Sequence, residues 1–132
     1  MSLWKLEDGQ KMIAEIRTTE ELEKVLFEMQ QKLESKNLIV FLSHPEGQFM
    51  HIGLSKDLGF LNYHNTLDEP PYYSTVGDKS LTLDDGVVEF YINGYLSEIP
   101  LRNCISFEKL LTAVKDFFRT GNLSNSIEWE ED

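Results

Sequence analysis

The feature that most constrains the fold is a pair of β-rich runs separated by Asn93-Gly94. Residues 87–92 (Val-Val-Glu-Phe-Tyr-Ile) precede this dipeptide, and residues 95–99 (Tyr-Leu-Ser-Glu-Ile) follow it. Asn-Gly favours a type I′ turn, because both residues tolerate positive φ and the twist of this turn matches paired antiparallel strands. We therefore predict a β-hairpin over residues 87–99.

Two other segments have the periodicity of amphipathic helices. The first follows Thr18-Thr-Glu-Glu21, which has the pattern of a capping box. The second follows Ser106, a candidate N-cap, and ends naturally at Gly121. The apolar positions of one face recur at helical spacing in both segments. They are Leu22, Val25, Leu26, Met29 and Leu33 in the first, and Phe107, Leu110, Leu111, Val114, Phe117 and Phe118 in the second.

Further short apolar or alternating runs predict strands at 11–16, 38–42, 49–54 and 58–63. We also expect an edge strand at 72–76, after Pro70-Pro71 has interrupted regular structure. The ending at 127–132 alternates like a strand, and we expect Trp129 to dock on the protein's own sheet. Strands that are adjacent in sequence favour antiparallel pairing. We thus expect an α+β fold in a single domain over residues 1–132: a mainly antiparallel sheet of about five to seven strands, with two amphipathic helices packed on one face.

The charge is strongly negative and unevenly distributed. The formal net charge is −11; residues 66–98 hold seven acidic side chains against Lys79 alone, and residues 120–132 hold four acidic side chains and no basic one. Phosphate groups would repel such a chain, so we exclude nucleic acid and anionic membranes as partners. A basic protein would be attracted. Acidic loops also keep proteins soluble, and charge alone leaves that alternative open.

Catalytic and metal-binding motifs are not evident in the sequence. Cys104 is expected to be a buried structural thiol, and the sequence has no G-x-S-x-G elbow and no phosphate-binding glycine loop. Carboxylate pairs such as Asp84-Asp85 could divide acid and base roles, but nothing in the sequence places an apolar pocket beside them. We therefore expect a protein that is not an enzyme and has no catalytic residue, cofactor, metal or small-molecule substrate. A small-ligand or metal-binding domain that uses His44, His51 or His64 is kept as a third alternative.

The sequence also allows an expectation about the cellular compartment of the protein. No apolar run approaches the roughly 20 residues of a membrane-spanning helix. The first nine residues include Glu7 and Asp8 and lack the basic start and apolar core of a signal peptide. We expect the cytoplasm.

Tyrosines lie within or beside the acidic middle segment. Tyrosine is an amphipathic anchor, and carboxylates interleaved with it suit a surface that binds a basic protein. The alternative is that about half of these aromatic rings face the core, as strand alternation requires. The candidate partner-binding residues are Asp68, Glu69, Tyr72, Tyr73, Asp84, Asp85, Glu89, Tyr95 and Glu98.

Four short motifs follow one another in the C-terminal half. They are Gly94-Tyr-Leu-Ser-Glu-Ile-Pro100, Phe107-x-x-Leu-Leu-x-x-Val-x-x-Phe-Phe118, Thr120-Gly121 and Ile127-Glu-Trp-Glu130. This stretch, roughly residues 87–131, resembles the Imm1 family of bacterial immunity proteins. The resemblance implies a non-enzymatic protein that binds and neutralises a toxin made beside it, often a nucleic-acid deaminase or nuclease.

The resemblance and the charge point to the same mechanism. A toxin that acts on nucleic acid needs a basic active-site surface, and an acidic partner can occlude it. We therefore expect an immunity protein with a cognate toxin domain as partner. The alternative is a non-enzymatic adaptor module that binds another protein and has no toxin partner.

Overall fold

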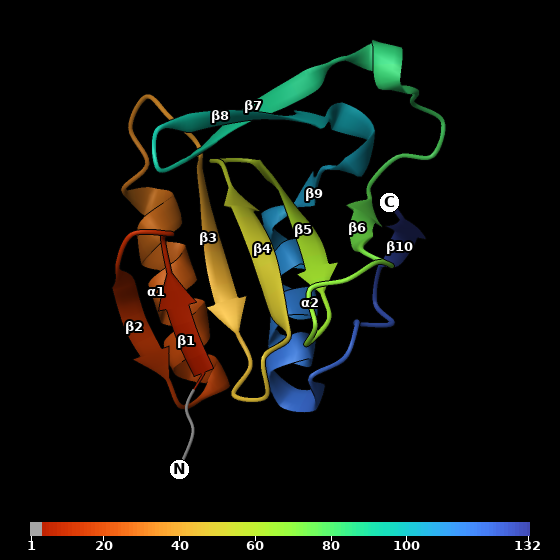
Figure 1. Cartoon of the computed structure of the whole chain (residues 1–132). Coiled ribbons are helices and arrows are strands. Elements are labelled where there is room, and N and C mark those ends of the chain that lie inside the picture. The colour runs from red at the N-terminus through yellow and green to blue at the C-terminus, as the bar shows by residue number, and fades with distance from the viewer. Residues whose placement is uncertain (1–3) are drawn as a thin grey trace.

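The computed structural model describes residues 4–132, whose ten strands join in one hydrogen-bonded sheet (Figure 1). The strands are β1 (Trp4–Glu7), β2 (Met12–Ile16), β3 (Leu38–Ser43), β4 (Phe49–Leu54), β5 (Leu58–His64), β6 (Tyr73–Val76), β7 (Val87–Ile92), β8 (Tyr95–Pro100), β9 (Ile105–Ser106) and β10 (Glu128–Glu131). The helices are α1 (Thr19–Gln31) and α2 (Phe107–Thr120), and short 3₁₀ turns form η1 (Leu83–Asp85) and η2 (Leu101–Asn103). The predicted α+β class is confirmed.

The order along the sheet is β10-β6-β5-β4-β3-β1-β2, with β9 paired to β5 and the β7–β8 hairpin joined to β3. Every pairing is antiparallel except the single parallel contact of Leu38 in β3 with Tyr91 in β7. The expected number of strands, about five to seven, is wrong, because the sheet has ten. β1 and β9 are four and two residues long. Segments this short carry no period, and they are strands because neighbouring strands pair with them.

The strand predicted at 72–76 is present as β6, but it is not an edge strand. β10 pairs antiparallel along its outer side, with Trp129 opposite Thr75, and β5 pairs along its inner side. The chain reaches this position only after α2, so the pairing depends on the path of the whole C-terminal half. β10 is therefore the edge of the sheet.

Both helices begin where the sequence indicates, and α2 also ends where it indicates. However, α1 ends at Gln31, so Leu33 of the predicted apolar face lies beyond the helix, and only the Thr18 half of the predicted capping box is formed. The Thr18 hydroxyl accepts a hydrogen bond from the Glu21 N–H at 3.1 Å, and the Ser106 hydroxyl accepts one from the Lys109 N–H at 3.3 Å. These bonds satisfy backbone donors that a helix leaves free in its first turn. α2 ends at Gly121, whose φ of 76° is in the left-handed region.

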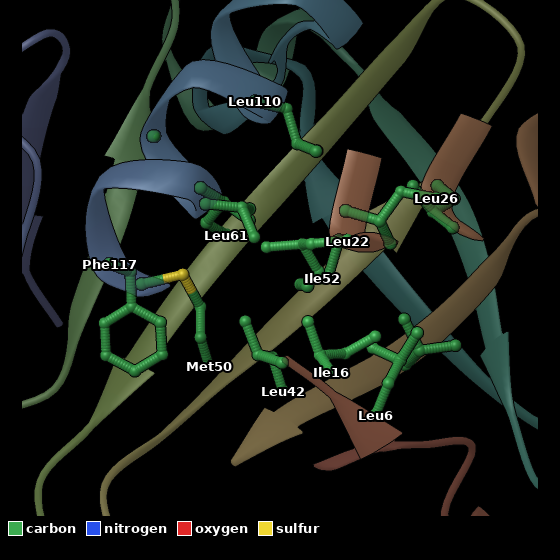
Figure 2. Close-up of a cluster of buried hydrophobic side chains, with 14 of the residues drawn as sticks. Leu6, Ile16, Leu22, Leu26, Leu42, Met50, Ile52, Leu61, Leu110 and Phe117 are labelled. Atoms are coloured by element: carbon green, nitrogen blue, oxygen red, sulfur yellow. The ribbon is translucent and has the colours of Figure 1, made fainter. Parts of the chain in front are cut away.

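The main core lies between the helices and the sheet. Figure 2 shows Leu22 and Leu26 of α1 pointing toward the same cluster as Leu110 and Phe117 of α2, and all four are fully buried. The strands contribute every second residue, as pleating requires. They include Leu6, Ile16, Val40, Leu42, Met50, Ile52, Leu54 and Leu61. Trp129 packs against this cluster and donates from Nε1 to the Ser124 carbonyl oxygen at 2.9 Å, so the prediction that it docks on its own protein is confirmed.

A second, smaller cluster lies under the β7–β8 hairpin. Ile39 and Phe60 alternate along their strands with residues of the main core, so they face the opposite side of the sheet. Phe90 of β7 packs edge-on against Phe60 with ring centres 5.0 Å apart. The turn of the hairpin is as predicted, since Asn93 and Gly94 have φ of 51° and 81°. Figure 1 shows that the hairpin crosses one end of the sheet and that both helices lie on the other face.

None of the helices within residues 4–132 has the length and apolar character needed to cross a membrane.

Candidate partner-binding surface

A groove of about 450 Å³ lies between the β7–β8 hairpin and the face of the sheet that bears Ile39 and Phe60. Its apolar lining comes from Ile39, Phe60, Ile92, Ile99 and Pro100. Its polar lining comes from His51, Asn62, Ser74, Ser97, Asn103 and Asp132. A concave site with a largely apolar wall and a few polar groups at one end has the general form of a ligand-binding site in proteins.

Asn62 organises the polar end of this groove. Its Oδ1 accepts from His51 Nδ1 at 3.2 Å and from His64 Nε2 at 2.5 Å. Its Nδ2 donates to Ser74 Oγ at 3.0 Å and to Asp132 Oδ2 at 2.8 Å. Because an ionised carboxylate can only accept, the contact with Asp132 requires the amide nitrogen on this side, and the Asp132 carboxylate is held in place.

The network continues to Asp68, one of the residues singled out from the sequence. Its Oδ1 lies 2.6 Å from His64 Nδ1, and its backbone carbonyl accepts from the Tyr72 hydroxyl at 2.8 Å. The Tyr72 and His64 rings are 4.3 Å apart. Burial lowers the pKa of His51, which lies deeper in the same network. Asp68 and Tyr72 are thus brought together next to the groove.

Glu69 and Tyr73, the other two residues predicted in this region, do not join the network beside the groove. Glu69 is exposed, and its backbone is held by the side chain of Asn65. Tyr73 is paired with Tyr63, which packs against the main core, so the two rings share the helix side of the sheet. Tyr73 therefore lies on the opposite face from the groove.

The remaining predicted residues lie on the hairpin and on the turn that leads into it. Glu89 and Glu98 are directly opposite each other in the β7–β8 ladder, and both are exposed. Phe90 is buried next to Glu89, so the two carboxylates are on the outer face of the hairpin. Tyr95 is 75% exposed at the tip and pairs with Ile92, one of the groove-lining residues.

Asp84 and Asp85 are both exposed in η1. Asp85 Oδ2 accepts from the Thr82 N–H at 2.6 Å and closes a capping box, so this carboxylate stabilises the turn. The structure consequently does not bring the predicted residues together in one place. Asp68 and Tyr72 lie beside His64, whereas Glu89, Tyr95 and Glu98 lie on the hairpin. Asp84 and Asp85 lie in η1, and Tyr73 lies on the other face of the sheet.

The three histidines are not brought together. His44 accepts a hydrogen bond at Nδ1 from the Glu46 N–H at 2.9 Å and packs against Trp4. His51 and His64 are neighbours, with ring centres 4.8 Å apart, but both are directed at the Asn62 amide oxygen. Within residues 4–132 no three His, Cys, Asp or Glu side chains are grouped as a metal ion would require.

Sequence reasoning did not single out the groove residues Asn62, Ser74, Asn103 and Asp132. Single polar residues in strands and loops carry no pattern. They meet because β5 pairs with β6 and β6 with β10, and because Asn103 of η2 donates to the Thr75 carbonyl of β6. The Cys104 prediction is confirmed: the thiol is buried, and burial raises its pKa to about 11.

Glu130, part of the Trp-Glu ending, has a clear structural contact. Its carboxylate accepts from Arg102 Nη1 and from Asn103 Nδ2, the latter at 2.6 Å. The Arg102 guanidinium, followed by the Asn103 amide, holds the pKa of Glu130 below its ordinary value. This contact ties β10 to η2 and positions Asn103 at the wall of the groove.

The two helices cover one face of a mainly antiparallel sheet, and a hairpin crosses the other face above a largely apolar groove. These features define a small α+β protein with a candidate binding groove. The chain belongs to the Imm1 family of immunity proteins: the family model described as immunity protein Imm1 matches residues 11–131. The match extends from the turn before β2 to the end of β10 and thus includes the first half of the chain. A search of curated proteins found no match. Membership of the family implies a bacterial immunity protein with a cognate toxin as its partner, and the family is generally non-enzymatic.

Proposed function

We propose that this protein acts in the cytoplasm, binds a cognate toxin domain that acts on nucleic acid, such as a deaminase or nuclease, and occludes its basic active-site surface. The observation that carries the proposal is the cross-strand pair Glu89–Glu98 on the outer face of the hairpin. Like charges directly opposite each other destabilise a β-ladder. Neither carboxylate takes part in any ion pair formed within residues 4–132. A cationic partner surface would convert this unfavourable pair into a favourable contact.

Long-range electrostatics supports the same proposal. The net charge is −11, and the carboxylates of Asp68, Asp84, Glu89 and Glu98 are all exposed. A toxin domain that binds nucleic acid has a positive surface where the phosphates bind. Attraction between the two surfaces raises the rate of association, and salt weakens the attraction. Inhibition then follows from physical occlusion, because the substrate and this protein compete for one surface.

The experiment that tests the proposal uses the toxin domain encoded beside this chain. Co-expression should restore growth, and the two proteins should elute as one complex from a size-exclusion column. Unchanged toxicity with separate elution would overturn the proposal.

A charge-reversal pair tests the surface itself. We expect Glu89→Lys to lower the association rate constant about tenfold and to make its salt dependence shallower. Glu28→Lys is the matched control, since Glu28 is exposed on α1 and the change of charge is identical. Equal association rates for the two variants would show that the hairpin is not the docking surface.

A further inference from the structure

We propose that the groove beneath the β7–β8 hairpin receives one long basic side chain, an arginine or a lysine, from the partner. This inference rests on the proposed function, which supplies the partner. It adds a specific point of insertion to the broad acidic surface described above.

The apolar part of the groove suits the stem of such a side chain. Ile39 and Phe60 project from the sheet, and Ile92 and Ile99 line the groove from the hairpin. Lysine and arginine carry three or four methylene groups, which pack on apolar surfaces while the charged end reaches a polar partner. A short acidic or amide side chain would leave this lining uncovered.

The charge at the polar end selects a cation. Asp132 Oδ2 is held by Asn62 Nδ2, and the Asp132 carboxylate takes part in none of the ion pairs formed within residues 4–132. The nearby Glu130 is already neutralised by Arg102. An anionic guest would be repelled by Asp132. An uncharged apolar guest would remove water from this carboxylate without replacing its interactions, which is costly.

The walls of the groove are positioned before the partner arrives. Phe90 is fully buried and packs against Phe60, which anchors the hairpin to the sheet. At the other end Asn103 donates to the Thr75 carbonyl at 2.9 Å and to Glu130 at 2.6 Å. A preformed groove avoids the entropic cost of ordering its walls on binding.

Two substitutions in the groove test the inference against the neighbouring toxin domain, with the dissociation constant measured by calorimetry. Ser97→Trp places a large ring in the groove, and Asp132→Asn removes the negative charge but keeps an oxygen that can accept from Asn62. We expect each to raise the dissociation constant about tenfold or more. The controls are Thr112→Trp on the exposed face of α2 and Glu131→Gln, whose side chain projects from the opposite face of β10. Both controls should stay within about twofold of the unsubstituted protein.

The outcomes separate this inference from the proposed function. Tight binding that is weakened by both groove variants and by neither control supports the inference. Tight binding that is unaffected by Asp132→Asn overturns it and leaves the proposed function standing. If the unsubstituted protein does not bind the toxin domain, both are overturned. Thermal unfolding verifies that each variant is folded. If Ser97→Trp does not fold, the test rests on Asp132→Asn alone.

Discussion

Glu130→Gln is the substitution whose effect on stability follows most directly from the structure. The carboxylate accepts from both Arg102 and Asn103, and the side chains of Glu130 and Arg102 are 35% and 25% exposed. A fully buried hydrogen bond to a charged group contributes about 1.5–3 kcal/mol. Solvent screens part of this at the present exposure, and glutamine keeps one acceptor oxygen. We therefore expect a loss of about 1–2 kcal/mol in the free energy of unfolding.

The assay is urea unfolding followed by circular dichroism. The expected loss corresponds to a midpoint lower by about 0.5–1 M for a slope of about 2 kcal/mol per molar urea, which is in the middle of the range for chains of this size. Glu131→Gln, one residue further along β10 and exposed, serves as the control and should change stability by less than about 0.5 kcal/mol.

The dependence on pH provides the sharper test of the same contact. The pKa of Glu130 is lower in the folded state than its ordinary value of 4.5. Its ionised form therefore stabilises the fold above that pH, and the contribution disappears as the pH falls through the lowered pKa. The gap between the parent protein and Glu130→Gln should be full at pH 7 and should shrink below about pH 4.5. A gap that is absent at pH 7, or that is the same at pH 7 and in acid, would refute the reasoning.

Three other predictions concern different parts of the fold. Gly77→Ala should cost about 3 kcal/mol or more, or prevent folding, because an added Cβ would meet the Cys104 carbonyl oxygen at 1.8 Å; thermal unfolding measures this. The Cys104 thiol, with its pKa raised to about 11, should react with Ellman's reagent at pH 8 only after denaturation, and rapid labelling of the native protein would contradict its burial. Thr18→Ala should cost about 1 kcal/mol by losing the bond from the Glu21 N–H, whereas Thr18→Ser should retain most of the stability in urea unfolding.

Local sequence signals predicted the elements whose causes are local. Thr18 and Ser106 cap the two helices, and Asn93-Gly94 forms the turn of the hairpin. Each signal acts over a few residues, through a hydroxyl that accepts from the backbone or through residues that adopt positive φ. The limits of this reasoning are visible in β1 and β9, which are too short to show a period and exist through pairing with distant strands.

The candidate site was predictable only in part. The enrichment of carboxylates in residues 66–98 is a property of composition, and the six predicted acidic residues are indeed exposed. Their arrangement is not encoded locally. Tyr72 precedes β6 and is held by the Asp68 carbonyl, whereas Tyr73 is the first residue of β6 and faces the helix side because it pairs with Tyr63.

By itself, the sequence determined the class of fold, the hairpin, the two helices and the Imm1 family. These depend on periodicity, capping and short motifs, which are read along the chain. The tertiary structure alone decided that Asn62, Ser74, Asn103 and Asp132 meet under the hairpin, since they come from segments up to 70 residues apart in the chain. It also decided that Glu89 lies opposite Glu98 on the outer face. The register of the strands brings these side chains together, and the helices determine which face of the sheet is covered. Both are defined only when the whole sheet has assembled.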